Sequence, residues 1–234
     1  MTAASLALLS VRQQVSSAIR TAIYDGELKP GARLTERQIC ERAGVSRTIA
    51  REVIRELEAE RLIESNRRHG FVVAAMSLKE IGDLYDVRVL LEARASALCA
   101  AAMTDDLARR LDLAMEAIEM AAAAGDREAQ RTSNTAFYET IFAAADNIVL
   151  GQILHSLHGR VSYLRSRSMA QRGRPQKSLQ ELKALLAALK SGDGDAAARL
   201  STAHIEAARA VALSAFGEDG KLRDKAAARQ EVDA

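Results

Sequence analysis

Residues 35–73 read TERQICERAGVSRTIAREVIRELEAERLIESNRRHGFVV, and this stretch decides the fold of the first part of the chain. Thr35 followed by Gln38 forms a capping box, which starts a helix by satisfying its first free backbone amides. Gly44 ends that short helix, and Ser46 caps a longer one that runs through Glu60. Two helices separated by a short turn are therefore predicted, and a further helix over residues 9–25 precedes them.

The residues after the second helix predict a small two-stranded hairpin. Leu62-Ile63 and Phe71-Val72-Val73 are short apolar runs, and residues 66–70 between them are polar and end in glycine. Helix, turn, helix and hairpin in this order are typical of a winged helix-turn-helix. In that module the second helix lies in the DNA major groove, with its N-terminal residues nearest the bases.

The start of the second helix carries residue types that suit DNA. Arg47 and Arg51 are spaced i, i+4 and project from one face, opposite the apolar residues of the helix. An arginine grips guanine O6 and N7 with two hydrogen bonds, or it neutralises a phosphate. The alternative is that both arginines only solvate the helix and pair with Glu52 or Glu56.

Basic residues at two further points favour the DNA interpretation, because such a module also touches DNA with its preceding helix and its wing. Arg37 lies in the preceding helix, and Arg67, Arg68 and His69 lie at the hairpin tip. The predicted DNA-binding residues are Arg37, Ser46, Arg47, Thr48, Arg51, Arg67, Arg68, His69 and Gly70.

The same region resembles the GntR family of bacterial repressors. GELKPGARLTE at 26–36 and GVSRT at 44–48, followed by Arg51-Glu52, match that family's patterns G-x-L-x-P-G-x-x-L and V-S-R-T-P-x-R-E-A-L. The resemblance spans residues 11–75. It implies that Arg37, Arg47 and Arg51 bind operator DNA, with His69-Gly70 entering the minor groove. Ile49 replaces the family's proline, and we expect a change in packing there.

Composition and a second capping box define the rest of the chain. Alanine and leucine dominate, tryptophan is absent and aromatic residues make up 3%, which favours a mainly α protein. Ser77 and Glu80 mark a boundary between a winged helix-turn-helix domain over 1–76 and an all-helical effector-binding and dimerisation domain over 77–217. A charged tail over 218–234 follows. The predicted helices of the second domain cover 78–102, 104–123, 127–144, 147–168, 178–190 and 195–216.

Charge and hydropathy exclude some classes of protein. The net charge is +2, and residues 1–76 hold 12 Lys and Arg against 9 Asp and Glu, which is only a mild basic bias. No apolar run is long enough to cross a membrane, and the N-terminus does not read as a signal peptide. A cytoplasmic protein with no membrane partner is expected.

The helical part resembles the C-terminal domain of the FadR subfamily, the FCD-type domain, in segments 84–92, 134–150 and 179–205. In many such domains a divalent cation is held by a carboxylate, a histidine one turn later and two further histidines. Here the family's D-x-x-F-H pattern has Asn134 and Tyr138, its E-H pattern reads Glu181-Leu182, and only His204 keeps an imidazole. No metal or other cofactor is therefore predicted, and a cation at His204 and Asn134 is the remaining alternative.

An effector site is expected in the same place. Asn134 and Tyr138 share one helical face, His204 is expected beside them, and Arg88 would pair with a carboxylate ligand. The alternative is an internal pair between Arg88 and Glu92, spaced i, i+4. Elsewhere one helix carries His155, His158, Arg160, Arg165 and Arg167, which predict a solvated or dimer-facing surface.

These features together predict a sequence-specific regulator, expected to be a repressor. It would bind a palindromic double-stranded operator as a homodimer, since a palindrome presents two identical half-sites. The effector would be a small organic acid. The alternatives are a regulator with a vestigial pocket and an enzyme. The enzyme is disfavoured because the nucleophile, phosphate-loop and metal-protease motifs are missing from the sequence.

Overall fold

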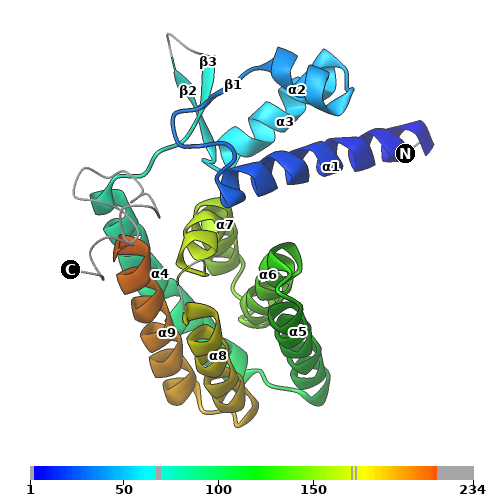
Figure 1. Cartoon of the computed structure of the whole chain (residues 1–234). Helices are drawn as coiled ribbons and strands as arrows, with labels where there is room; N and C mark the ends of the chain where they lie inside the picture. Colours follow the sequence, from blue (N-terminus) through cyan, green and yellow to red (C-terminus); the bar gives the residue numbers. More distant parts are fainter. Residues whose placement is uncertain (1–2, 67–69, 170, 172, 215–234) are drawn as a thin grey trace, which may run out of the picture. The chain divides into compact units, whose positions relative to one another are not determined.

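The computed structural model describes residues 3–66, 70–169, 171 and 173–214. It divides into two compact units (Figure 1). The first consists of residues up to Ala75 together with Ser156–Tyr163. The second consists of Met76–His155 together with the described residues from Leu164 onward. The predicted charged tail lies outside the described residues.

The first unit is a winged helix-turn-helix, as predicted. Its elements are α1 (Ala3–Asp25), β1 (Arg33–Leu34), α2 (Glu36–Ala43), α3 (Arg47–Ala59), β2 (Ile63–Asn66) and β3 (Gly70–Val73). Helix α1 begins six residues before the predicted start at Leu9, which the apolar pattern alone did not reveal.

The predicted hairpin is present as β2 and β3, which pair antiparallel, and in the described residues β1 adds a third strand that the sequence did not predict. The order is β1-β3-β2, and β1 pairs antiparallel with β3. The Gly31 amide donates to the Val73 carbonyl at 2.8 Å, and the Val73 amide donates to the Ala32 carbonyl at 2.9 Å. A strand of two residues is too short to show the alternation of apolar and polar residues by which strands are predicted, and its partner lies far along the chain.

Local capping forms the helix pair where it was expected. The Thr35 amide donates to Gln38 Oε1 at 2.9 Å, and the Gln38 amide donates to Thr35 Oγ1 at 3.2 Å. Gly44 ends α2 with φ of 65°, in the left-handed region that glycine adopts most readily. Ser46 Oγ accepts a hydrogen bond from the Ile49 amide and so starts α3.

One face of α3 is buried in the core of the first unit. Ala50, Val53, Ile54 and Leu57 are at most 1% exposed. Ile49, at the position of the family's proline, is half-buried on the edge of that face. Burial of this face fixes which side of α3 remains available to solvent.

The second unit is built of helices alone in its described residues, which confirms the mainly α fold. They are α4 (Leu78–Ala101), α5 (Asp105–Ala124), α6 (Arg127–Ala144), α8 (Arg174–Lys190), α9 (Gly194–Ser214) and the two ends of α7 (Ile148–Met169), whose residues 156–163 are grouped with the first unit. Ser77 forms the predicted capping box with Glu80. Helix α8 begins at Arg174 rather than at 178, because a proline in the first turn of a helix does not interrupt it.

The helices of the second unit enclose an apolar core. Phe137, Leu111 and Leu185 are among its fully buried members. Helices α4, α8 and α9 contact one another (Figure 1). At Gly194 an added Cβ would lie 3.2 Å from the Ala97 carbonyl oxygen, so glycine lets α9 begin close to α4. None of the helices in the described residues is long and apolar enough to cross a membrane.

Candidate DNA interface and effector site

The side of α3 away from the core carries the predicted DNA-reading residues. Arg47, Thr48 and Arg51 are exposed, and so is Ser46 at the N-cap. All four lie in or beside the first turns of the helix, where free backbone amides also favour anions. The structure therefore brings these side chains together on one accessible surface.

Arg51 is paired with an acidic residue, although not with either of the expected ones. Its Nε donates to Glu36 Oε1 of α2 at 3.0 Å. This hydrogen bond lowers the pKa of Glu36, and the charge of Arg47 acts in the same direction. Glu56, one of the partners considered from the sequence, instead pairs with Arg20. An exposed ion pair of this kind is weak, so Arg51 can exchange Glu36 for DNA at little cost.

The other predicted DNA-binding residues are placed only in part. Arg37 on α2 is 82% exposed and lies 3.6 Å from Glu41. Gly70 begins β3 with φ of 77°, a value that favours glycine at the end of the wing loop. Arg67, Arg68 and His69 lie outside the described residues.

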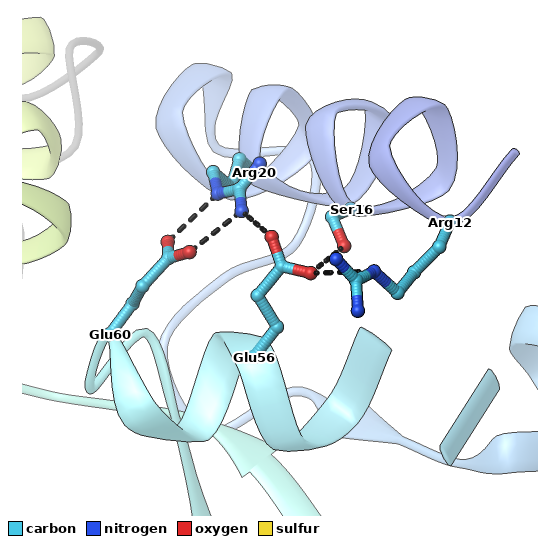
Figure 2. A network of polar contacts seen from close by, with 5 residues as sticks. All are labelled: Arg12, Ser16, Arg20, Glu56 and Glu60. Carbon is cyan, nitrogen blue, oxygen red and sulfur yellow. Dashed lines mark hydrogen bonds and ion pairs between the residues drawn. The ribbon is translucent and has the colours of Figure 1, made fainter. Parts of the chain in front are cut away.

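A polar network that the sequence did not reveal joins α1 to the C-terminal half of α3 (Figure 2). Arg20 donates to the Glu60 carboxylate through Nε at 2.8 Å and through Nη2 at 2.6 Å, and Nη2 also contacts Glu56. Ser16 Oγ donates to Glu56 Oε2 at 3.0 Å, and Arg12 Nε lies 3.6 Å from the same oxygen. The hydrogen bond with Glu60 is the main reason that the pKa of Arg20 is raised.

In the second unit, Arg88 and Glu92 form the internal pair that was the alternative to ligand binding. Arg88 Nε donates to Glu92 Oε1 at 2.7 Å, and the two side chains are 3% and 4% exposed. Burial disfavours the charge on Arg88, but the Glu92 carboxylate outweighs it and raises the Arg88 pKa. Glu92 Oε2 is buried and finds no hydrogen-bond partner among the described residues.

Tyr138 and His204 lie together, as expected, and Arg165 joins them. The Tyr138 and His204 ring centroids are 6.4 Å apart, and the Arg165 guanidinium carbon lies 4.6 Å from the Tyr138 centroid. Arg165 is partly exposed, so the predicted surface position is not contradicted, and its guanidinium also lies on the Tyr138 ring. Burial raises the pKa of Tyr138 to about 12, so its hydroxyl stays protonated.

Two functional candidates were missed by sequence reasoning. Arg174, at the start of α8, donates from Nη1 to Glu181 at 2.8 Å, and Glu181 Oε2 lies 2.7 Å from His204 Nδ1. The Gly173-Arg174-Pro175 segment was interpreted as a helix break, and Glu181 only as the remnant of a metal motif. The buried polar cluster is defined here as the buried residues Arg88, Glu92, Tyr138, Arg174 and His204 together with the partly exposed Arg165 and Glu181.

The protonation of His204 follows from its surroundings. Burial lowers its pKa, and the hydrogen bond to Glu181 opposes this only in part. Burial alone would raise the pKa of Glu181, but hydrogen bonds from His204 and Arg174 outweigh it and lower that pKa. A carboxylate only accepts hydrogen bonds, so the neutral imidazole carries its hydrogen on Nδ1.

Acidification is expected to destabilise the second unit through His204. Its folded-state pKa lies below the ordinary 6.5, so the unfolded chain takes up a proton first. The stability present at neutral pH is thus lost as the pH falls through 6.5, by at most about 1.4 kcal/mol per pH unit. Glu181 adds a second loss below pH 4.5, since its folded pKa is lowered from that value.

Urea unfolding between neutral pH and pH 5 measures this effect. In His204→Asn an amide donor replaces the imidazole Nδ1, and the variant should lose stability less steeply than the wild type over this range. Equal slopes for the two proteins would contradict the assignment of a neutral buried His204.

The donor set does not fit the cation site that many FCD-type domains contain. Asn134 Nδ2 donates to the Gln130 carbonyl of its own helix at 2.6 Å, and Leu182 is part of the apolar core. Glu181 is already shared between Arg174 and His204. Among the described residues, no three His, Cys, Asp or Glu side chains gather closely enough to hold a metal ion.

The histidine pair on α7 is described only in part. The His155 side chain is 76% exposed, and its Nδ1 lies 3.5 Å from Glu139. The side chains of His158 and Arg167 lie outside the description. A surface hollow of about 270 Å³ lies beside His155 and is lined also by Phe142 and Ile148. It is not lined by the buried polar cluster.

The two units define a class of protein, the transcription regulators that join a DNA-reading module to a separate helical domain. Residues 11–73 match the bacterial regulatory proteins of the gntR family, and residues 83–207 match the FCD domain. The chain therefore belongs to the gntR family of bacterial regulators, with an FCD domain at its C-terminal side. It is a transcription regulator and not an enzyme.

Named relatives and solved structures agree with this assignment. The "Probable D-xylose utilization operon transcriptional repressor" of Paenarthrobacter nicotinovorans is 30% identical over 88% of this chain and 90% of its own length. The galactonate operon transcriptional repressor of Escherichia coli is 30% identical over 75% of this chain and 85% of its own. The structure of E. coli McbR/YncC shares the fold with a TM-score of 0.74 at 22% identity, covering 87% of this chain and 97% of that one.

Proposed function

We propose that this regulator is a repressor that binds a palindromic double-stranded operator as a homodimer and responds to a small organic acid. The DNA part rests on one observation, the exposed Arg47 and Arg51 on the side of α3 opposite its buried face. Arg37, Ser46 and Thr48 would add phosphate contacts. The wing residues Arg67, Arg68, His69 and Gly70 are proposed to contact DNA, with His69 and Gly70 in the minor groove.

Exposed apolar side chains of the second unit support a dimer. Leu90 on α4 is 72% exposed, Ile148 on α7 is 77% exposed, and Val149 beside it is 64% exposed. Ile148 and Val149 are neighbours in the chain, and apolar side chains that gather at the surface favour contact with another protein surface. A second copy of the chain is the occupant that a two-fold operator requires.

The buried polar cluster supports a carboxylate effector. A guanidinium in a site closed to water binds a carboxylate through paired, charge-assisted hydrogen bonds. Two relatives are named as repressors of galactonate and gluconate operons, and these operons carry the names of polyhydroxylated carboxylates. Arg88, Asn134, Tyr138 and His204 remain the proposed effector-binding residues, and no cofactor is proposed.

Recovery of genomic DNA fragments by the purified protein, followed by sequencing at moderate salt, tests this function. The expected result is enrichment of a few sites that share a short palindrome. An organic acid should then change the affinity of the protein for those sites. Diffuse recovery without a shared motif would contradict sequence-specific binding, because phosphate contacts alone do not select a sequence.

A further inference from the structure

The buried polar cluster contains a guanidinium whose hydrogen-bonding capacity is only half used. The Arg174 side chain is 3% exposed, and only its Nη1 contacts Glu181. Its Nε and Nη2 are buried and have no hydrogen-bond partner among the described residues. These two nitrogens form one edge of the guanidinium plane, and that edge matches the two oxygens of a carboxylate.

A hydrogen-bond acceptor from outside the chain would satisfy Arg174 Nε and Nη2. A buried charged donor without a hydrogen-bond partner destabilises the folded protein, and such groups are rare in native structures. Because both nitrogens are closed to solvent, a ligand must shift neighbouring side chains to reach them. Binding would therefore favour a different arrangement of this unit, which is what an effector must do.

Further buried polar atoms without a hydrogen-bond partner lie in and beside the cluster. They indicate that the ligand carries polar groups in addition to a carboxylate. The Tyr138 and Tyr85 hydroxyls are buried without a partner among the described residues, and so is the acceptor Glu92 Oε2. Glu92 and Arg174 both lie close enough for their charges to act on the Tyr138 hydroxyl. A simple fatty acid offers no donor for Glu92, whereas a ligand with hydroxyl groups can satisfy donors and acceptors together.

Charge limits the number of carboxylates on the ligand. The cluster holds three guanidinium groups and two carboxylates: Arg88 pairs with Glu92, Arg174 pairs with Glu181, and the partly exposed Arg165 lies over the Tyr138 ring. One positive charge therefore remains within the cluster while His204 is neutral. A single carboxylate balances that charge, whereas a second would be buried without a counterion.

The same arrangement disfavours a cation. His204 Nδ1 is engaged by Glu181, and Glu181 also holds Arg174 at 2.8 Å. A metal ion beside His204 would lie near a fixed guanidinium and would compete with it for the same carboxylate. Arg174 already places a positive charge beside Glu181 and His204.

We propose that the second unit binds a hydroxylated monocarboxylate without a metal ion, and that the free edge of Arg174 grips its carboxylate. The hydroxyl groups of the ligand face Glu92 and Tyr138. This inference rests on the proposed effector function, and it names the chemical class of the effector and its principal anchor.

Titration calorimetry of the full-length protein in EDTA tests the proposal. The probes are the hydroxylated monocarboxylates gluconate, galactonate, xylonate and glycerate, with hexanoate, the dicarboxylate glucarate and neutral sorbitol for comparison. At least one hydroxylated monocarboxylate should bind, and at least about tenfold more tightly than the comparison compounds. Arg174→Met should weaken that binding roughly 10- to 100-fold.

Control variants separate anchoring from folding. Arg174→Lys keeps the charge but loses the paired geometry, so it should also bind weakly while it still binds operator DNA. Arg199→Met, which removes an exposed arginine from the neighbouring α9, should bind the probe as the wild type does.

Three outcomes overturn the inference, and one of them also overturns the effector part of the proposed function. Binding that appears only after Zn²⁺ or Mn²⁺ is added would refute the metal-free site but leave an effector-responsive regulator. Tighter binding of glucarate or hexanoate would refute the proposed ligand class. If no organic acid binds with or without metal, while a palindromic operator is still enriched, the protein is a regulator without this kind of effector.

Discussion

Arg47→Ala weakens binding to the operator roughly 10- to 100-fold and relaxes specificity at the base pair that Arg47 contacts. The reason is geometric, because Arg47 is exposed on the first turn of α3, directly after the Ser46 cap. Fluorescence anisotropy with the enriched operator, and with copies altered at single base pairs, measures both effects. The buried face of α3 is untouched by the change, so the fold should be retained.

Arg109→Ala is the matched control for this prediction. It removes the same charge from an exposed position of α5, where the Arg109 side chain is 68% exposed. Its operator affinity should equal that of the wild type. If Arg47→Ala were equally harmless, Arg47 would be a solvated surface residue and base reading would have to come from Arg51, Arg37 or the wing.

Arg20→Met destabilises the first unit by about 1–3 kcal/mol. The substitution keeps the aliphatic stem but removes the nitrogens that bridge Glu60 and Glu56 (Figure 2). The two half-buried carboxylates then lose their common partner. Removing one side of such a network lowers the free energy of unfolding by more than the intact network contributes to it. Scanning calorimetry should show the transition of the first unit at a midpoint several degrees lower.

Lys79→Met provides the comparison for Arg20. Lys79 pairs with Asp83 at 2.6 Å, yet its side chain is 83% exposed, so loss of that pair should leave both transitions unchanged. A wild-type transition for Arg20→Met would show that the apolar contacts between α1 and α3 are sufficient without the network.

Features that depend on neighbours in sequence could be predicted closely. The caps at Thr35, Ser46 and Ser77 are present as expected, because a capping side chain needs only the backbone amide two or three residues on. The apolar face of α3 follows from helical periodicity in the same way. Local chemistry therefore accounts for the helix pair and for the start of the second domain.

Features that depend on distant partners could not be predicted. Nothing near Arg174 in the sequence indicates that it lies against Glu181 and His204, and its proline neighbour suggested a break instead of a helix start. Arg165 shares α7 with several polar residues, and only the packing of α6 shows that it lies over Tyr138. The same holds for Arg20, whose partners in α3 and directly after it are 36 and 40 residues away.

The pairing of β1 with β3 has a consequence for how the first unit folds. Arg33 and Leu34 are joined to Val72 and Phe71, so the two ends of the segment containing both α2 and α3 are fastened to each other. Such a contact closes a long loop. It forms late in folding because the chain loses the conformational entropy of that loop before the contact adds any stability. The helix pair is thus part of one cooperative element with the wing. A fragment that ended after α3 would leave β1 without its partner strand and should be less stable than the whole unit.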